Sequence, residues 1–299
     1  MFAELVVLGV RTGAVYRIDA ETGNVATIRE RAGWSPDGVV VENGTVYWTT
    51  MGKPVLDPGI PGEAGMDYTA RDGGLHAMRL DGTEVRDVLA PGTITTGKQL
   101  ASDRAGTLYW GDREGFRVSR VRTDGSGLTD LVVNNPDTSG LQECVGVAVD
   151  RAAGYLYWTQ KGPSKGGAGR ILRAGLEIPE EETAATRSDI DVLWDGLPEP
   201  IDLELRGGWL YWTDRGAEPG GNTLNRAPIP AAGEKGAGPV ILAGGFTEAI
   251  GLAVDSDRAY VSDLGGRISV VPLPEAGGGE VRVLVQLQDH FTGLAGIGA

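Results

Sequence analysis

Three features of this 299-residue sequence predict an all-β fold, a six-bladed β-propeller. A short aromatic segment recurs at a mean spacing of about 50 residues, which is typical of propeller blades. Apolar and polar residues alternate with a period of two around each copy, which favours strands. Glycine is abundant, at 48 residues, without the period of collagen, as expected for many turns between short elements.

The recurring segment marks the second strand of each predicted blade. Four copies contain the pair Tyr-Trp, a fifth keeps the frame without the Trp, and a weaker copy lies near the amino terminus. In chain order they are LVVLGV (5–10), TVYWTT (45–50), TLYWGD (107–112), YLYWTQ (155–160), WLYWTD (209–214) and RAYVSD (258–263). Six copies account for the whole length, so residues 1–299 are predicted to form one propeller domain.

Each copy lies inside a larger unit of four strands. In 143–177 a first strand ends in an acidic residue and a turn, and the aromatic strand and a third strand follow. A fourth short run then closes the unit, as in 191–196. Residues 289–299 have the form of a first strand without a second, whereas the chain begins at a second strand. We therefore expect 289–299 to pair with 1–31 as the first blade, which closes the ring without an open edge.

Charge and composition exclude several classes of function. The chain has 27 Lys and Arg against 41 Asp and Glu, a net charge of −14, so no basic surface is available for nucleic acid or an anionic membrane. One Cys and two His exclude a disulfide framework and the usual zinc sites. The amino terminus lacks a signal-peptide pattern, and no apolar run approaches the roughly 20 residues that span a bilayer. A cytoplasmic protein is the expectation.

The first strands bring titratable residues to one end of the predicted channel, the end where the connections between second and third strands also lie. Aligned on the small residue of a Gly-x-Ala pattern, the residues one and three positions earlier share a strand face and form two stacked rings. Acids gathered with a Lys and a His have pKa values that move apart, which suits acid/base catalysis. The candidate catalytic residues are Asp37, Lys98, Glu143, Glu199, Glu248 and His290. The alternative is that these groups cap loop amides or face water at a solvated rim.

Further positions are candidates for substrate binding. Blade 5 has Asp202 and Glu204 where other blades have Gly and Ala, so the two carboxylates either line the channel or pair with a buried donor of the neighbouring blade. Insertions at 51–74, 161–170 and 215–223 fall at the same end as the candidate catalytic residues, either as ligand contacts or as ligand-free surface loops. The candidate substrate-binding residues are Gln99, Asp202, Glu204, Tyr68, Arg71, Lys161 and Thr292.

Residues that recur with the repeat are expected to hold the blades together. The acids that end the aromatic segment and the arginines of the third strands are expected to bond each other or the backbone, and the tryptophans to pack in the core. They are Asp112, Asp214 and Asp263; Arg17, Arg120, Arg173 and Arg226; and Trp48, Trp110, Trp158 and Trp212. His76, in mid-strand, and Cys144, with no His nearby in sequence, are also expected to be structural.

The Tyr-Trp segments are similar to the YWTD repeat of the six-bladed propellers of low-density-lipoprotein receptors, over essentially the whole chain. A looser resemblance links SPDGVVVENGTVYW (35–48) to the gluconolactonase and strictosidine-synthase group, in which the Asp of the matching strand is a metal ligand. The second resemblance implies acid/base work on a lactone, ester or condensation substrate. It makes Asp37, with Glu143, the candidate ligand set for a divalent cation such as calcium. Other residues of the gluconolactonase pattern are not evident, so metal dependence stays open.

Two functions follow. The preferred one is a cytoplasmic enzyme that acts on a small organic substrate at the channel mouth, as a lactonase or other hydrolase, or as a lyase or cyclase. The alternative is a non-catalytic YWTD propeller that binds a protein or small-molecule ligand through its loop face. An open pocket ringed by the acids would support the enzyme, and a channel plugged by apolar or salt-bridged side chains would support the binding protein.

Overall fold

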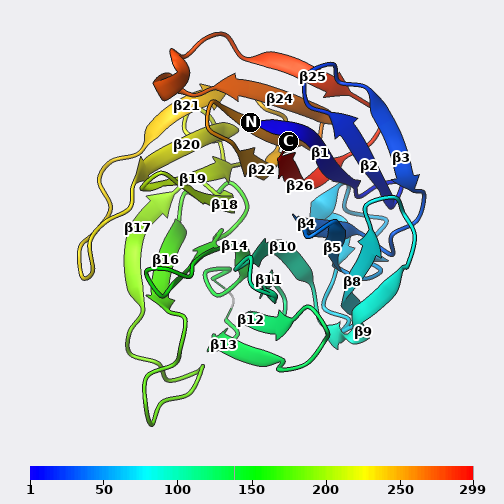
Figure 1. Cartoon of the computed structure of the whole chain (residues 1–299). Coiled ribbons are helices and arrows are strands. Elements are labelled where there is room, and N and C mark those ends of the chain that lie inside the picture. The colour runs from blue at the N-terminus through cyan, green and yellow to red at the C-terminus, as the bar shows by residue number, and fades with distance from the viewer. Residues whose placement is uncertain (138, 299) are drawn as a thin grey trace.

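Six sheets surround a central channel in the computed structural model, which describes residues 1–137 and 139–298 (Figure 1). The predicted all-β, six-bladed propeller is confirmed. The last residue of the segment 289–299 lies outside the described residues. No helix in the described part of the chain is long and apolar enough to cross a membrane.

Each blade is one four-stranded antiparallel sheet whose first strand, the inner strand, lines the channel. Blade 1 contains β26 (Phe291–Gly298), β1 (Phe2–Gly9), β2 (Ala14–Asp19) and β3 (Val25–Arg29). Blade 2 contains β4 (Pro36–Glu42), β5 (Thr45–Thr50), β8 (Gly73–Arg79) and β9 (Arg86–Ile94). Blade 3 contains β10 (Gly97–Ser102), β11 (Thr107–Asp112), β12 (Arg117–Arg122) and β13 (Thr129–Val133).

The remaining blades repeat this order. Blade 4 contains β14 (Cys144–Asp150), β15 (Tyr155–Gln160), β16 (Gly169–Gly175) and β17 (Asp191–Leu197). Blade 5 contains β18 (Pro200–Arg206), β19 (Trp209–Asp214), β20 (Thr223–Pro228) and β21 (Val240–Gly244). Blade 6 contains β22 (Ala249–Val254), β23 (Arg258–Asp263), β24 (Arg267–Pro272), the 3₁₀ turn η2 (Pro274–Ala276) and β25 (Arg282–Gln286).

The ring closes as predicted. Strand β26 pairs with β1 in antiparallel register, with Ala295 opposite Val6 and Leu294 opposite Val7. The two ends of the chain therefore lie side by side (Figure 1). This closure gives the first blade four strands like the others, because the last strand supplies its inner strand.

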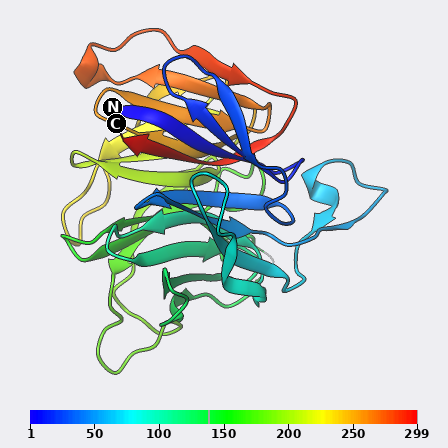
Figure 2. The ribbon, with the colours of Figure 1, turned by 45° about the vertical axis from the view of Figure 1, so that its right-hand side comes forward.

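The two ends of the channel differ. The inner strands begin at one end, here named the loop face, where residues 51–74 form a long insertion with β6 (Val55–Leu56), the 3₁₀ turn η1 (Glu63–Gly65) and β7 (Met66–Asp67). Figure 2 shows this light-blue insertion projecting to the right, while both chain ends lie at the opposite side, here named the termini face. The predicted position of the insertion at the end where the inner strands begin is confirmed.

The tryptophans of the repeat form the centre of the cores between blades. Trp48, Trp110, Trp158 and Trp212 are each buried to 2% exposure or less. Trp110 of blade 3 packs with Val40 and Tyr47 of blade 2, so each core is shared by neighbouring sheets. Burying a large aromatic or aliphatic side chain contributes about 1.5–3 kcal/mol, so these contacts hold the ring together. Their predicted core role is confirmed.

A hydroxyl two positions after the Tyr of the repeat connects four of the blades to the next blade. In blade 5 the N–H of Asp202 donates to Oγ1 of Thr213 (3.1 Å), and that hydroxyl donates to the carbonyl of Ile250 in blade 6 (2.6 Å). Thr49, Thr159 and Ser262 make the same double contact. Blade 3 has Gly111 instead, where a Cβ would lie 2.7 Å from carbonyl oxygens of blade 4. The backbones of blades 3 and 4 approach too closely there for a side chain.

The acids that end the aromatic segments hold the turns before the inner strands. Asp112 accepts the N–H groups of Thr95 (3.1 Å) and Thr96 (2.7 Å), and Asp214 accepts the N–H of Glu199 (3.0 Å). Asp263 accepts the N–H of Thr247 and pairs with Arg267. Their predicted structural role is confirmed.

The arginines of the third strands are confirmed as structural too. Arg173 of blade 4 donates to the carbonyls of Pro230 (2.7 Å) and Ala231 (3.0 Å) in blade 5. Arg173 also pairs with Asp191, and the other three pair with acids as well: Arg17 with Glu4, Arg120 with Glu177, and Arg226 with Glu275. Two of these three pairs also connect one blade to the next, because Glu177 follows β16 and Glu275 lies in η2.

Candidate functional site

A buried ion pair joins the first two candidate residues at the channel. Nζ of Lys98 on β10 lies 2.9 Å from Oδ1 of Asp37 on β4, and the amide of Gln99 donates to the other carboxylate oxygen (3.0 Å). All three side chains are buried. Burial lowers the pKa of the Lys98 ammonium, and the charge of Asp37 opposes this shift. The contact between inner strands of adjacent blades is the one that the stacked rings predict.

Three further candidates are each held by a cation from a neighbouring loop. The pairs are Glu143 with Lys161 (3.1 Å), Glu199 with Arg215 (2.8 Å) and Glu248 with Lys165 (2.5 Å). Glu199 is fully buried and also accepts the backbone N–H of Lys165 (2.9 Å). The acids therefore gather at the loop face as predicted, but they are neutralised there by the basic residues of the 161–170 and 215–223 loops.

His290 lies apart from these pairs. It is exposed, and its Nδ1 contacts the carbonyl oxygen of Leu264. Within the described residues it makes no hydrogen bond or ion pair with any of the other five candidate catalytic residues. The structure therefore does not bring an imidazole into contact with the acids.

The insertion closes the channel at the loop face. Glu63 of η1 places its carboxylate between Nη1 of Arg113 (3.1 Å) and Nη1 of Arg215 (2.7 Å), which belong to blades 3 and 5. Burial raises the pKa of Glu63, but the charges of Arg215 and Arg113 outweigh it and hold that pKa well below its usual range. This contact links the insertion of blade 2 to blades 3 and 5 at the loop face.

An apolar layer lies behind the ion pairs. Val145, Ile201 and Ile250, from the inner strands of blades 4, 5 and 6, pack together with Leu264. On the other side of the ring Thr292 donates its hydroxyl to the carbonyl of Pro36 (2.9 Å). One ring of inner-strand residues contains Val145, Ile201 and Ile250 together with Thr292, Asp37 and Lys98. Half of this ring is apolar and half is ion-paired or hydrogen-bonded. A channel plugged in this way is expected for the non-catalytic alternative.

The remaining loop-face candidates make protein contacts. Tyr68 is buried; its hydroxyl lies 3.3 Å from Oγ of Ser35, and Arg113 lies over its ring at 5.7 Å. Arg71 is exposed and donates two hydrogen bonds to the carbonyl of Thr93. Lys161, besides its pairing with Glu143, donates to the carbonyl of Gly162. These groups stabilise the loops of this face.

The proposed calcium ligands do not fit a metal site. Both carboxylate oxygens of Asp37 accept hydrogen bonds from Lys98 and Gln99, and Glu143 pairs with Lys161. Among the residues described, no three His, Cys, Asp or Glu side chains gather as a ligand set. Calcium requires six to eight oxygen ligands, which this arrangement does not offer.

Asp202 and Glu204 lie beyond the plug, in a cavity of about 230 Å³ toward the termini face. Asp202 accepts the N–H groups of Leu203 and of Leu252 in blade 6 (both 2.9 Å), so its buried donor in the neighbouring blade is a backbone amide and no salt bridge forms. Burial raises the pKa of Asp202 well above its usual range. Burial also raises the pKa of Glu204, to about 7, against the opposing charges of Arg104 and Arg206.

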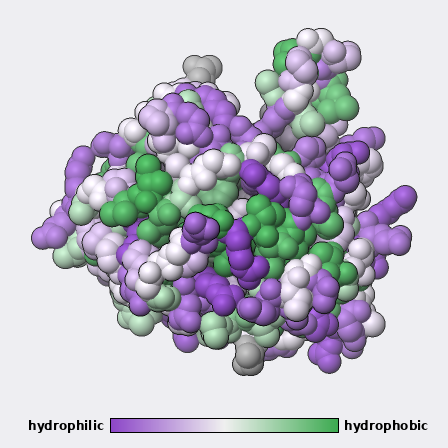
Figure 3. Space-filling view, turned by 90° about the horizontal axis from the view of Figure 1, so that it is seen from above, coloured by the Kyte–Doolittle hydropathy of each residue, from purple (hydrophilic) through white to green (hydrophobic). Residues whose placement is uncertain are grey.

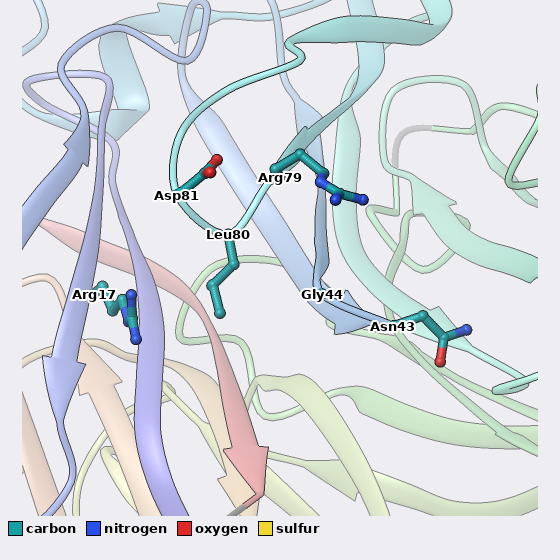
Figure 4. Close-up of a pocket in the computed structure, with 6 residues that line it drawn as sticks. All are labelled: Arg17, Asn43, Gly44, Arg79, Leu80 and Asp81. Carbon is teal, nitrogen blue, oxygen red and sulfur yellow. The ribbon is translucent and has the colours of Figure 1, made fainter.

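A second hollow, of about 300 Å³, lies between blades 1 and 2 away from the channel. Figure 4 shows Arg17 on the blade 1 side, facing residues of blade 2. The lining residues are Arg17, Asn43, Gly44, Arg79, Leu80 and Asp81. Arg17 is paired with Glu4, so the charge in this hollow is already balanced in part.

The predicted structural roles of His76 and Cys144 are confirmed. His76 lies on β8 between Thr50 (3.1 Å from Nε2) and Asp87 (2.7 Å from Nδ1). Cys144 is fully buried, and burial raises the pKa of its thiol far above the range of a reactive cysteine.

Sequence reasoning missed the three residues that close the loop face: Glu63, Arg113 and Arg215. A signal for the arginines was present, because Arg follows Asp in both YWGDR and YWTDR. Glu63 lies in the insertion 51–74, which stands out in the sequence by its length. Nothing in the sequence of the insertion indicates which of its acids turns toward the channel.

Two relatives by sequence are fungal proteins. No protein-family model matches the chain. The chain is 37% identical over 305 residues to the low-density lipoprotein receptor-related protein 1 of Pyricularia oryzae. This alignment covers 95% of this chain and 92% of that protein. The chain is 39% identical over 280 residues to the 3-hydroxyacyl-CoA dehydrogenase-like protein LAM1 of Cochliobolus heterostrophus, which covers 87% of this chain but only 56% of that protein.

Similar solved structures share the fold at low identity. Nidogen, in a nidogen/laminin complex, has a TM-score of 0.69 at 15% identity, over 98% of this chain and 97% of that chain. A gluconolactonase of Xanthomonas campestris has a TM-score of 0.61 at 16% identity, over 94% and 82%. A calcium-binding protein, regucalcin, of Agrobacterium tumefaciens has a TM-score of 0.57 at 15% identity, over 88% and 78%.

Proposed function

This chain belongs to the low-density lipoprotein receptor-related family of YWTD propellers, and from that premise we propose that it is a non-catalytic protein that binds a protein ligand on its loop face. One observation carries the proposal. The acids expected to do chemistry are ion-paired beneath the insertion 51–74, and the same insertion turns apolar side chains to solvent.

The exposed apolar cluster consists of four residues of the insertion and one neighbouring tryptophan. Their exposed fractions are 64% for Val55, 63% for Leu56, 46% for Ile60, 39% for Met66 and 62% for Trp34. Figure 3 shows the insertion as the projection at the upper right, with green, apolar side chains on it. Aromatic residues and Met are enriched at protein interfaces, and apolar side chains exposed together on one loop mark interaction sites.

The charges around the cluster indicate the chemistry of the ligand. The insertion carries Asp57, Glu63, Asp67 and Asp72 against Lys53 and Arg71, and the whole chain has a net charge of −14. A ligand with apolar side chains flanked by Lys and Arg would match both the cluster and its rim. The receptor-related name of the fungal relative and the nidogen/laminin complex support binding of a protein.

Hydrolysis of a small lactone or ester is the second candidate, because gluconolactonases share this fold. For that activity the contact of Glu63 with Arg113 and Arg215 has to open. At least one acid then has to leave its cation partner before it accepts a proton. Because of these two requirements, hydrolysis is less well supported than binding of a protein. Neither the binding proposal nor the hydrolase proposal depends on a cytoplasmic location.

Selection of displayed peptides on the intact chain tests the proposal. Twelve-residue peptides from a random phage library are selected, and their Kd is measured for wild type, for Val55→Ser/Leu56→Ser/Ile60→Ser and for Val240→Ser/Ile241→Ser. The last two positions are each 53% exposed on the outer strand β21 and serve as the matched control. We expect apolar, basic peptides whose Kd rises at least tenfold in the triple variant only.

Two results would overturn the proposal. One is selected peptides that bind the triple variant as tightly as wild type. The other is turnover of δ-gluconolactone by wild type that Glu143→Gln abolishes, which would support the hydrolase instead.

A further inference from the structure

We propose that the cavity at the termini face binds a small organic amine in its ammonium form, with the apolar body of the amine against the cavity wall and the ammonium group against Glu204. This site lies behind the apolar layer of the channel, at the opposite end from the proposed protein-binding face, and is independent of it.

The wall of the cavity comes from all six inner strands and combines apolar side chains with polar groups. Its volume is about 230 Å³, and its lining includes Val40, Leu100, Val147, Leu252, Leu294 and Phe2. An apolar protein cavity of about 150 Å³ holds benzene. A ring with one aminomethyl group is therefore of suitable size for the space around Glu204.

Glu204 is the lining carboxylate left to a ligand. Both oxygens of Asp202 already accept backbone N–H groups. No hydrogen bond or ion pair from the described residues reaches the carboxylate of Glu204, although this side chain lines the cavity. The side chain of Glu204 is half-buried, and an ammonium group that enters the cavity would pair with it.

Both acidic and basic groups lie around Glu204. On its own strand lie Asp202 and Arg206, and Arg104 approaches from the turn after β10 with one Nη donating to the carbonyl of Val41. Opposite it on β19 is Tyr211, whose hydroxyl accepts from Arg226.

The lining residues of the two neighbouring inner strands, β14 and β22, are uncharged. The charged residues of the cavity lining are thus Asp202, Glu204 and Arg104. The net charge of −14 adds a general attraction for cations.

Benzylamine is the probe, and benzyl alcohol is its neutral counterpart of the same shape. Because burial raises the pKa of Glu204 to about 7, about one tenth of the carboxyl is ionised at pH 6 and most of it at pH 8. Calorimetric titration of the intact chain should therefore give a Kd for benzylamine about tenfold larger at pH 6 than at pH 8. Benzyl alcohol should bind at least tenfold more weakly than benzylamine at pH 8 and show no such pH dependence.

Variants locate the binding. Glu204→Gln should raise the Kd of benzylamine at pH 8 at least tenfold, whereas Glu248→Gln, which removes an acid at the loop face, should leave it unchanged. Ala101→Leu, which fills the cavity from β10, should abolish binding. Because it is a second cavity variant, the test does not depend on normal folding of Glu204→Gln. Equal binding of amine and alcohol, or full binding by both cavity variants while their unfolding curves match wild type, would overturn the proposal.

Discussion

The carboxylate of Glu63 lies 2.7 Å from Nη1 of Arg215, although 152 residues separate them along the chain. Glu63 comes from an insertion of blade 2 and Arg215 from the loop after β19 of blade 5. Because Arg113 of blade 3 holds the same carboxylate, the insertion is fixed across the channel from two sides.

Replacing Glu63 should loosen the insertion. Glu63→Gln leaves the buried Arg113 and Arg215 with less compensating charge, and the expected loss is about 1–2 kcal/mol, between values for exposed and buried pairs because Glu63 is partly exposed. Amide exchange in residues 51–74 should become faster, as measured by mass spectrometry. Glu218→Gln, an exposed acid of a nearby loop, is the control. Unchanged exchange in Glu63→Gln would show that the ion pairs do not hold the insertion.

The Asp37–Lys98 pair should behave as a buried ion pair. Asp37→Asn leaves the Lys98 ammonium buried without its counter-charge, and we expect a loss of about 3–5 kcal/mol in the free energy of unfolding. The double change Asp37→Asn/Lys98→Met should cost clearly less than the single change. Urea unfolding of the four members of this cycle measures the coupling, and purely additive effects would contradict it.

The connecting hydroxyl of Thr213 should be needed for stability, while its methyl group should not. Thr213→Val removes the acceptor for the N–H of Asp202 and the donor to Ile250, at a cost of about 1–3 kcal/mol. Thr213→Ser keeps the hydroxyl, as Ser262 does naturally in blade 6, and should cost much less. If serine and valine destabilise equally in thermal unfolding, the hydrogen bonds are not the reason for this residue.

Glu204 should make the protein less stable as pH rises. Its folded pKa of about 7 lies above the ordinary value of 4.5, so between these values the folded state holds more protons than the unfolded state. Stability contributed by the neutral carboxyl is therefore present below pH 4.5 and lost as pH rises to about 7. Glu204→Gln should be more stable than wild type by about 1–2 kcal/mol at pH 8, after discounting for partial exposure, and equal to it near pH 4. A variant less stable than wild type at pH 8 would contradict this.

The repeat predicted the blades because its residues make local contacts that recur from one four-stranded sheet to the next. The Trp found in four of the blades, the hydroxyl after it and the acid at the strand end each have one role, seen in Trp110, Thr213 and Asp214. Strand periodicity also placed Asp37 next to Lys98, because adjacent inner strands put equivalent positions side by side.

The partners of the acids could not be predicted in the same way. Lys161, Lys165 and Arg215 lie in loops, whose paths depend on glycine conformation and long-range contacts and leave no periodic pattern in the sequence. The same holds for η1, which carries Glu63 over the channel. His290 has the ring position of an inner-strand residue, but its side chain points to the Leu264 carbonyl and not to the acids.

Amide hydrogen exchange of the intact chain, with and without a saturating selected peptide, tests the binding account most directly. The account predicts that the peptide slows exchange in residues 51–74 and in the turn that contains Trp34, and leaves the inner strands at the termini face unchanged. Slowed exchange at the termini face, or none in 51–74, would contradict it.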